Sequence, residues 1–80
     1  MELNQNLKII EIFTGPNCAY CEQAKTLMSQ KRLEFVEKNI AAPGILEEFR
    51  ARLPRSKALP QIFLDGEHIS SLEDLQLRLK

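Results

Sequence analysis

Several features that would mark other classes of protein are missing from this chain. Its 11 basic and 11 acidic residues cancel, and neither sign forms a long run, so nothing indicates a nucleic-acid or other polyanionic partner. No apolar stretch approaches the length of a membrane span, and the first residues, Met1–Gln5, lack the character of a signal peptide. We therefore expect a cytoplasmic protein that does not contact a membrane.

The length leaves room for only one hydrophobic core. The chain has 80 residues, of which 44% are hydrophobic, and it contains no repeat, linker or low-complexity segment. We therefore treat residues 1–80 as a single domain.

The chain has only two cysteines, Cys18 and Cys21, at a point where a strand pattern gives way to a helix pattern. Residues spaced i and i+3 on a helix are close enough for a disulfide, and the unpaired N–H groups of a helix N-terminus favour a thiolate. A disulfide that closes so short a ring adds little to stability. In the cytoplasm such a pair is expected to be mostly reduced and catalytic.

Two other interpretations of the pair are weaker. A closed zinc site needs four ligands, and the chain offers only Cys18, Cys21 and the single histidine, His68, so we expect no metal. A structural disulfide is disfavoured by the compartment and the ring size. Under the redox interpretation, Cys18 at the helix tip is the nucleophile, and the more shielded Cys21 resolves the mixed disulfide.

The hydrophobic pattern predicts an α/β fold in the order βαβαββα. The first strand–helix–strand unit, about 30 residues long, predicts a right-handed crossover between two parallel strands. We expect a mixed four-stranded sheet flanked by helices on both faces. The predicted strands are Leu7–Phe13, Phe35–Ile40, Gln61–Leu64 and Glu67–Ile69; the predicted helices run from Ala19 to about Lys31, from Ala42-Pro43-Gly44 to Pro54, and from Ser70-Ser71 to the chain end.

Two local signals refine the last third of the chain. Asp65-Gly66, between the last two strands, is the pair that a tight primed β-turn prefers. Ser70 and Glu73 have the spacing of a capping box at the start of the last helix.

Pro60 stands immediately before the third strand, between Leu59 and Gln61. A trans peptide bond is the commoner choice at a strand entry, but a tight turn here also suits a cis bond. The third strand must pair beside the first, which would turn the preceding loop toward Cys18. A cis bond would leave the backbone groups of Leu59 unpaired and available to a peptide-like substrate.

Two further polar residues have an ordinary explanation. His68 could serve as a base, but its pattern is that of a hairpin strand residue with nothing to bring it near Cys18. Lys25 could add positive potential near the thiols, but a surface lysine of the first helix explains it more simply.

Together these residues resemble the glutaredoxin family over nearly the whole chain. Thioredoxins differ, because they usually carry a buried acid where this chain has Ile12. Glutaredoxin-like redoxins that are reduced by thioredoxin reductase usually carry a Trp-Ser-Gly-Phe-Arg-Pro segment, which is absent here. The matching segments are residues 13–21 (Phe-Thr-Gly-Pro-Asn-Cys-Ala-Tyr-Cys), Ala24-Lys25, residues 59–69 (Leu-Pro-Gln-Ile-Phe-Leu-Asp-Gly-Glu-His-Ile) and residues 70–75 (Ser-Ser-Leu-Glu-Asp-Leu).

The resemblance implies a thioredoxin fold and a monomer that reduces protein disulfides or glutathione mixed disulfides, with ribonucleotide reductase a frequent client of the family. Glutathione, as reductant, would join Cys18 as a mixed disulfide. Its backbone would pair with Leu59 before Pro60, and its γ-glutamyl carboxylate would meet the N–H groups that begin the last helix. The implied glutathione contacts are Tyr20, Leu59, Pro60, Leu72 and Glu73.

Three departures from the family pattern bear on this expectation. Ala19 replaces the usual proline of the dithiol motif, Gly15 replaces a basic residue, and Ser70-Ser71 replaces a Gly-Gly pair. The second and third predict weaker glutathione binding. The first leaves open a bridging [2Fe-2S] cluster carrier as an alternative, and a redoxin reduced by thioredoxin reductase is a third hypothesis. The cations that could compensate for Gly15 are Arg50, Arg52, Arg55 and Lys57.

Overall fold

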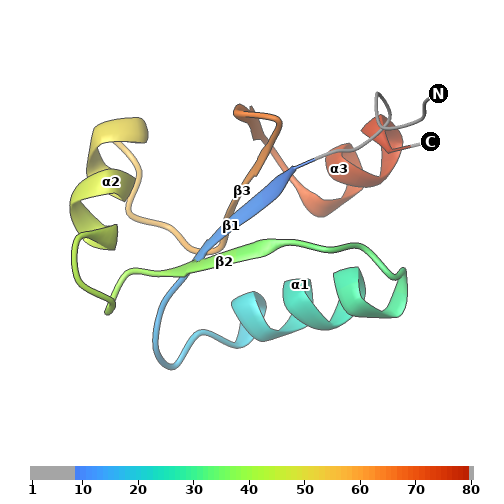
Figure 1. Cartoon of the computed structure of the whole chain (residues 1–80), viewed down its shortest axis with the longest axis horizontal. Helices are drawn as coiled ribbons and strands as arrows, with labels where there is room; N and C mark the ends of the chain where they lie inside the picture. Colours follow the sequence, from blue (N-terminus) through green and yellow to red (C-terminus); the bar gives the residue numbers. More distant parts are fainter. Residues whose placement is uncertain (1–8, 80) are drawn as a thin grey trace, which may run out of the picture.

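The computed structural model describes residues 9–79, and within them the elements follow the predicted order βαβαββα (Figure 1). None of the helices described has the length and apolar character needed to cross a membrane. The strands are β1 (Ile10–Thr14), β2 (Val36–Asn39), β3 (Gln61–Leu64) and β4 (Glu67–Ile69); the helices are α1 (Ala19–Gln30), α2 (Ile45–Arg52) and α3 (Leu72–Arg78).

The sheet has the order β2-β1-β3-β4, so β1 is paired on both edges. It runs parallel to β2 and antiparallel to β3, with Phe13 opposite Gln61, and both predicted pairings are confirmed. Because β1 and β3 are antiparallel, the end of β1 and the beginning of β3 lie at the same end of the sheet. The turn that leads to Cys18 and the loop that carries Pro60 therefore meet there.

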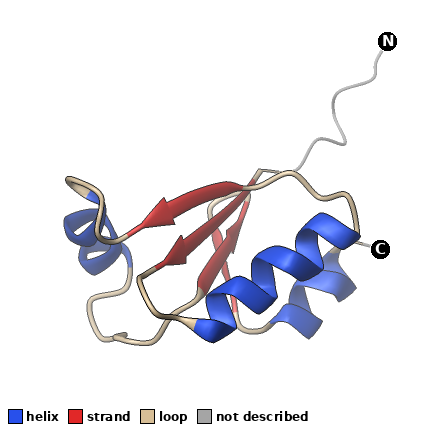
Figure 2. Ribbon diagram, turned by 90° about the horizontal axis from the view of Figure 1, so that it is seen from below, coloured by secondary structure: helices blue, strands red, loops and turns tan. Residues whose placement is uncertain are grey.

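Helices cover both faces of the sheet, as predicted (Figure 2). On one face, α1 and α3 pack aliphatic side chains against the strands, and on the other α2 packs Phe49 against two more aromatic rings. Alternation along each strand produces this division, because successive side chains point to opposite faces. The first cluster contains Ile10, Ile12, Ala24, Met28, Ile62, Leu64, Ile69 and Leu75; the second contains Phe13, Phe49 and Phe63.

The element boundaries lie close to the prediction, although β2 lacks the predicted end residues Phe35 and Ile40, and Ile9 precedes β1. The expected start of the first strand at Leu7 lies outside the described residues, but the strand extends to Thr14, which the sequence assigned to the turn. The predicted primed turn is confirmed, since Asp65 and Gly66 both have positive φ angles, 52° and 84°. The hairpin tip also holds the start of β1, because the Asp65 carboxylate accepts the N–H of Ile9 at 2.8 Å.

The predicted capping box was wrong by one residue. Ser71, not Ser70, is the N-cap of α3, and its hydroxyl accepts the N–H of Asp74 at 3.0 Å. The sequence Ser-Ser-Leu-Glu-Asp fits the motif in two registers. In the structure Ser70 instead donates its N–H and its hydroxyl to the Asp74 carboxylate, and the hydroxyl of Ser71 caps the helix.

A charged cluster holds α2 against the sheet. Glu11 of β1 accepts from Lys38 of β2 at 2.9 Å and from Arg52 of α2 at 3.1 Å, and Lys38 also pairs with Glu48 of α2. The Arg52 guanidinium lies 4.7 Å from the centre of the Phe63 ring. Burial opposes ionisation of Glu11, yet the bonds from Lys38 and Arg52 hold its pKa below the ordinary value.

We predict that Glu11→Gln lowers stability at neutral pH by about 1–2 kcal/mol, because the amide keeps one acceptor, turns an N–H donor toward the second cation and removes the negative charge. A carboxylate with a lowered pKa contributes stability above the pKa of the unfolded chain, about 4.3, and loses it as the pH falls through the folded value. The variant should therefore show a shallower loss of stability between about pH 5 and pH 2. Urea unfolding across this range tests it.

Exposed Glu34 provides the matched control, because within residues 9–79 it forms no ion pair. Glu34→Gln should leave both the neutral stability and the acid slope unchanged. An identical acid slope for Glu11→Gln and the native protein would contradict the assignment.

Candidate active site

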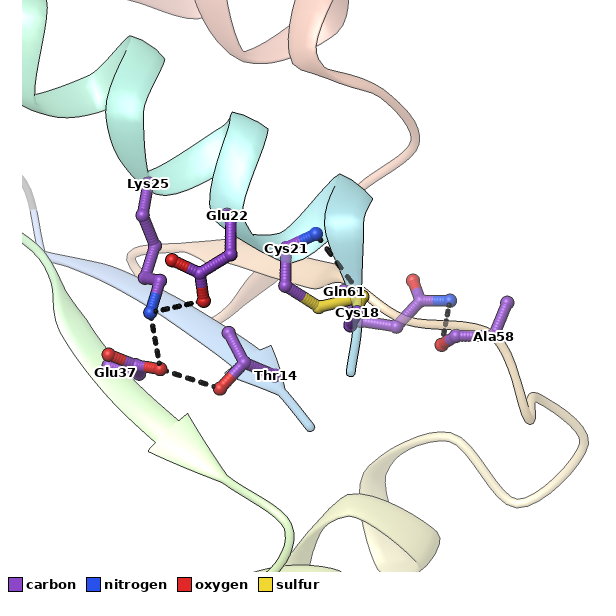
Figure 3. The surroundings of a disulfide bond; sticks show 8 residues. All are labelled: Thr14, Cys18, Cys21, Glu22, Lys25, Glu37, Ala58 and Gln61. Atoms are coloured by element: carbon purple, nitrogen blue, oxygen red, sulfur yellow. Dashed lines mark hydrogen bonds and ion pairs between the residues drawn. A yellow bond between two sulfur atoms is a disulfide. The ribbon is translucent and has the colours of Figure 1, made fainter. Parts of the chain in front are cut away.

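The two cysteines lie where α1 begins, at the end of the sheet described above. Cys18 is the N-cap of α1 in an extended conformation, and Asn17 before it has a positive φ of 57° that turns the chain into the helix. A disulfide joins Cys18 to Cys21, with their Cα atoms 5.3 Å apart (Figure 3). The Cys18 sulfur accepts the backbone N–H of Cys21 at 3.2 Å, so it takes the place of a capping side chain.

The two sulfurs differ in their access to solvent. Cys18 is half-buried at the helix tip, whereas Cys21, in the first turn, is 0% exposed. An attacking thiol must reach the substrate sulfur, whereas a resolving thiol needs only to reach its neighbour. The arrangement therefore suits an exchange that begins at Cys18 and ends at Cys21.

A hydrogen-bonded group beside the disulfide had no clear signal in the sequence. The buried Thr14 hydroxyl donates to Glu37 at 2.8 Å, and Lys25 lies 3.0 Å from both Glu37 and Glu22 (Figure 3). The Thr14 hydroxyl and then Lys25 hold the pKa of Glu37 below its ordinary value, and Glu22 and then Glu37 raise the pKa of Lys25. Lys25 therefore joins α1 to β2. This role depends on an ion pair between residues far apart in the sequence, so only the folded structure reveals it.

The loop before β3 reaches the same end of the sheet. The peptide bond between Leu59 and Pro60 is cis. The Leu59 side chain lies so close to Gly15 that a methyl group added to the glycine would be 2.8 Å from Leu59 Cδ1. Among residues 9–79, no hydrogen bond uses the backbone N–H or C=O of Leu59. This backbone is therefore free to pair with a peptide at the end of the sheet where Cys18 lies.

The remaining predicted contacts lie at the starts of two helices. Tyr20, in the first turn of α1, is 72% exposed, and Glu73 is exposed in the first turn of α3. Leu72 packs against the core and borders a groove along α1 that includes Glu22 and Gln23. The structure thus brings Leu72 beside the helix that carries the cysteines.

The start of α3 carries a carboxylate of its own. Asp74 accepts from both the N–H and the hydroxyl of Ser70, at 3.4 and 3.2 Å. Arg78 and then Ser70 hold the Asp74 pKa below its ordinary value. Negative charge at this position opposes the binding of a further anion.

A cationic groove runs between α2 and the loop before Pro60. Its volume is about 470 Å³, and Arg50 and Lys57 are the charged residues that line it, with no carboxylate among the lining residues. Arg52, another candidate cation, is instead paired with Glu11. The lining residues are Ile40, Leu46, Phe49, Arg50, Pro54, Ser56, Lys57 and Leu59.

Two remaining expectations concern His68 and metals. His68 lies in β4, as its pattern indicated, where its Nε2 is 2.8 Å from the Gln61 side-chain oxygen. In the part of the chain that the structure describes, no three His, Cys, Asp or Glu side chains cluster closely enough to hold a metal ion.

Comparisons of the sequence and of the structure with known proteins both find glutaredoxins. The glutaredoxin family model matches residues 10–69. Glutaredoxin 3 of Escherichia coli K12 is 36% identical over 66 residues, which cover 82% of this chain and 80% of that protein. The solution structure of a Brucella melitensis glutaredoxin is 36% identical with a TM-score of 0.61, covering 85% of this chain and 74% of that one. Glutaredoxin 1 of Francisella tularensis is 25% identical with a TM-score of 0.68, covering 90% and 92%.

The difference in burial predicts different reactivity after reduction. We expect limiting iodoacetamide to modify Cys18 at least about tenfold faster than Cys21, because Cys21 is shielded by the fold. Peptide mass spectrometry after digestion measures the two rates. In urea the two rates should converge, whereas equal rates in the folded protein would contradict the assignment.

Proposed function

Because the chain belongs to the glutaredoxin family and is a thiol–disulfide oxidoreductase, we propose that it reduces disulfides with electrons from glutathione. One observation carries the proposal: a partly exposed sulfur and a buried one share a helix start at the same end of the sheet as the unpaired backbone of Leu59. We expect the activity in the cytoplasm, in a monomer, with protein disulfides as substrates and ribonucleotide reductase among them by analogy with the family.

In the proposed reaction, the Cys18 thiolate attacks one sulfur of a substrate disulfide. The substrate S–S bond breaks as the new bond to Cys18 forms, and the departing thiolate takes a proton from water. The N–H of Cys21, which already bonds the Cys18 sulfur, favours the negative charge before attack. Cys18 is the nucleophile because it is the more exposed of the two.

Two routes then resolve the mixed disulfide and return the enzyme to its reduced form. On a protein substrate, Cys21 attacks the Cys18 sulfur, which releases the reduced protein and forms the Cys18–Cys21 disulfide. Two glutathione molecules then return two electrons and leave as glutathione disulfide. On a glutathione mixed disulfide, Cys18 carries the glutathione, and a second glutathione attacks that glutathione's sulfur, so Cys21 is not needed.

Binding of glutathione would use backbone and charge. Leu59, before Pro60, would pair with the peptide backbone of the bound glutathione, and Tyr20 would flank it. The N–H groups of Leu72 and Glu73 would meet the γ-glutamyl carboxylate, but Asp74 beside them opposes this contact. We expect the start of α3 to bind the γ-glutamyl carboxylate more weakly than it does in family members with Gly-Gly before the helix.

The other carboxylate of glutathione needs a cation, since Gly15 supplies none. Arg50 and Lys57 line the groove that Leu59 borders, and no carboxylate lies in its lining to compete. Arg52 is paired with Glu11, and Arg55 does not line the groove. We therefore assign the glycyl carboxylate to Arg50 and Lys57.

The first test of the proposal is glutathione-dependent reduction of 2-hydroxyethyl disulfide, coupled to glutathione reductase. We expect activity in the native protein, none in Cys18→Ser, and partial activity in Cys21→Ser, because the glutathione route needs only the nucleophile. Reduction of insulin by the same system should require both cysteines.

Absence of activity in the native protein, with the disulfide still formed on oxidation, would refute glutathione as the electron donor. Equal loss of 2-hydroxyethyl disulfide reduction in both variants would refute the assigned roles.

A second prediction tests the cationic groove. Replacing both Arg50 and Lys57 with alanine should raise the KM for glutathione about three- to tenfold with little change in kcat, because two exposed charge contacts are lost. The increase should shrink as salt is added, since salt screens exposed charges. Arg55→Ala removes a neighbouring cation outside the groove and should leave KM unchanged; an equal effect of this control would contradict the assignment.

A further inference from the structure

We propose that Gln61 is a positioning residue, whose side-chain amide holds the loop before β3 in the conformation that receives a peptide substrate. The inference deepens the proposed function, because it rests on the role given there to the backbone of Leu59. Gln61 itself touches no reacting atom in this scheme.

The amide ties the loop to the centre of the sheet. Gln61 is the first residue of β3, and its backbone is fixed by pairing opposite Phe13 of β1. Its side-chain Nε2 donates to the Ser56 hydroxyl and to the Ala58 carbonyl, both at 3.0 Å (Figure 3 shows the second bond). Both donors of the amide are therefore used on the loop.

The opposite side of the amide is also fixed. His68 Nε2 donates to the Gln61 oxygen at 2.8 Å, and the His68 ring packs 5.3 Å from the centre of the Phe63 ring. With its acceptor engaged by β4 and its two donors engaged by the loop, the amide has one orientation that satisfies every partner. The hairpin therefore sets where the loop can lie.

Little else of a polar kind holds this loop. Among residues 9–79, the other hydrogen bond to residues 55–60 is the turn in which the Ser56 N–H donates to the carbonyl of Leu53, the C-cap of α2. It fixes the start of the loop and not the part that carries Leu59. The Leu59 side chain packs near Gly15 but leaves its own backbone unpaired. Without the amide, the segment would need to be ordered by each substrate as it binds, which slows productive encounter.

Only a substrate that pairs with the Leu59 backbone should be sensitive to whether the loop is ordered before binding. A peptide disulfide has N–H and C=O groups to offer, whereas 2-hydroxyethyl disulfide has none. The two should therefore respond differently to loss of the amide, while any change in the dithiol itself would affect both equally.

The experiment measures single-turnover oxidation of the reduced protein, followed by acid quench and thiol counting by mass spectrometry. The two oxidants are the disulfide-linked dimer of Ala-Ala-Cys-Ala-Ala and 2-hydroxyethyl disulfide. Gln61→Met keeps the length of the side chain without the amide, and we expect the rate constant for the peptide to fall about tenfold with no change for the small disulfide.

A second variant, Gln61→Glu, tests the donor side of the amide separately from the acceptor side. It also serves as the test should Gln61→Met fold poorly. It keeps an acceptor for His68 but loses the donors to the loop, so we expect a loss similar to that of Gln61→Met. Gln30→Met, at the far end of α1, is the control and should match the native protein.

A fall for both oxidants, a fall for neither, or a native protein that shows no preference for the peptide would each overturn the proposal. Because no glutathione is present in this assay, failure of glutathione turnover would refute the proposed electron donor and leave this result standing.

Discussion

Pairing of β1 on both of its edges is the constraint on which the rest of the molecule depends. Parallel pairing with β2 requires a crossover, and α1 provides it while covering one face of the sheet. Antiparallel pairing with β3 brings the loop that carries Pro60 back to the end of β1. The helix start that carries the dithiol and the loop that offers free backbone groups therefore meet at one end of the sheet.

The opposite face shows how the fold supports that end. Glu11, Lys38 and Arg52 join two strands to α2 above an aromatic cluster, and this position of α2 determines where the following loop begins. Gln61 then holds the loop from the other direction. A segment without regular structure is thus held at both ends by residues that belong to regular elements, which is how a small protein can keep a loop ordered.

Much of the fold could be predicted, because the signals are local. The order of strands and helices follows from hydrophobic period, and the Asp65-Gly66 turn follows from the backbone conformations those residues tolerate. The capping box at α3 was misplaced because two adjacent serines fit the motif, and only the hydrogen bonds that each serine makes in the folded chain distinguish them. Thr14 was assigned to a turn because nothing local shows that its hydroxyl meets Glu37, 23 positions away.

The sequence by itself determined the chemistry of this protein: two cysteines at helical spacing behind a strand, and a proline at the entry to another strand, are features of residue type and spacing alone. The position of the pair at a helix start also predicted that Cys21 is the more shielded sulfur. Only the tertiary structure decided that Cys21 is buried completely, that Lys25 joins two elements, and that Gln61 links the hairpin to the loop. Burial and long-range hydrogen bonds depend on how the faces of distant elements meet, and that information is spread over the whole chain rather than held in any one segment.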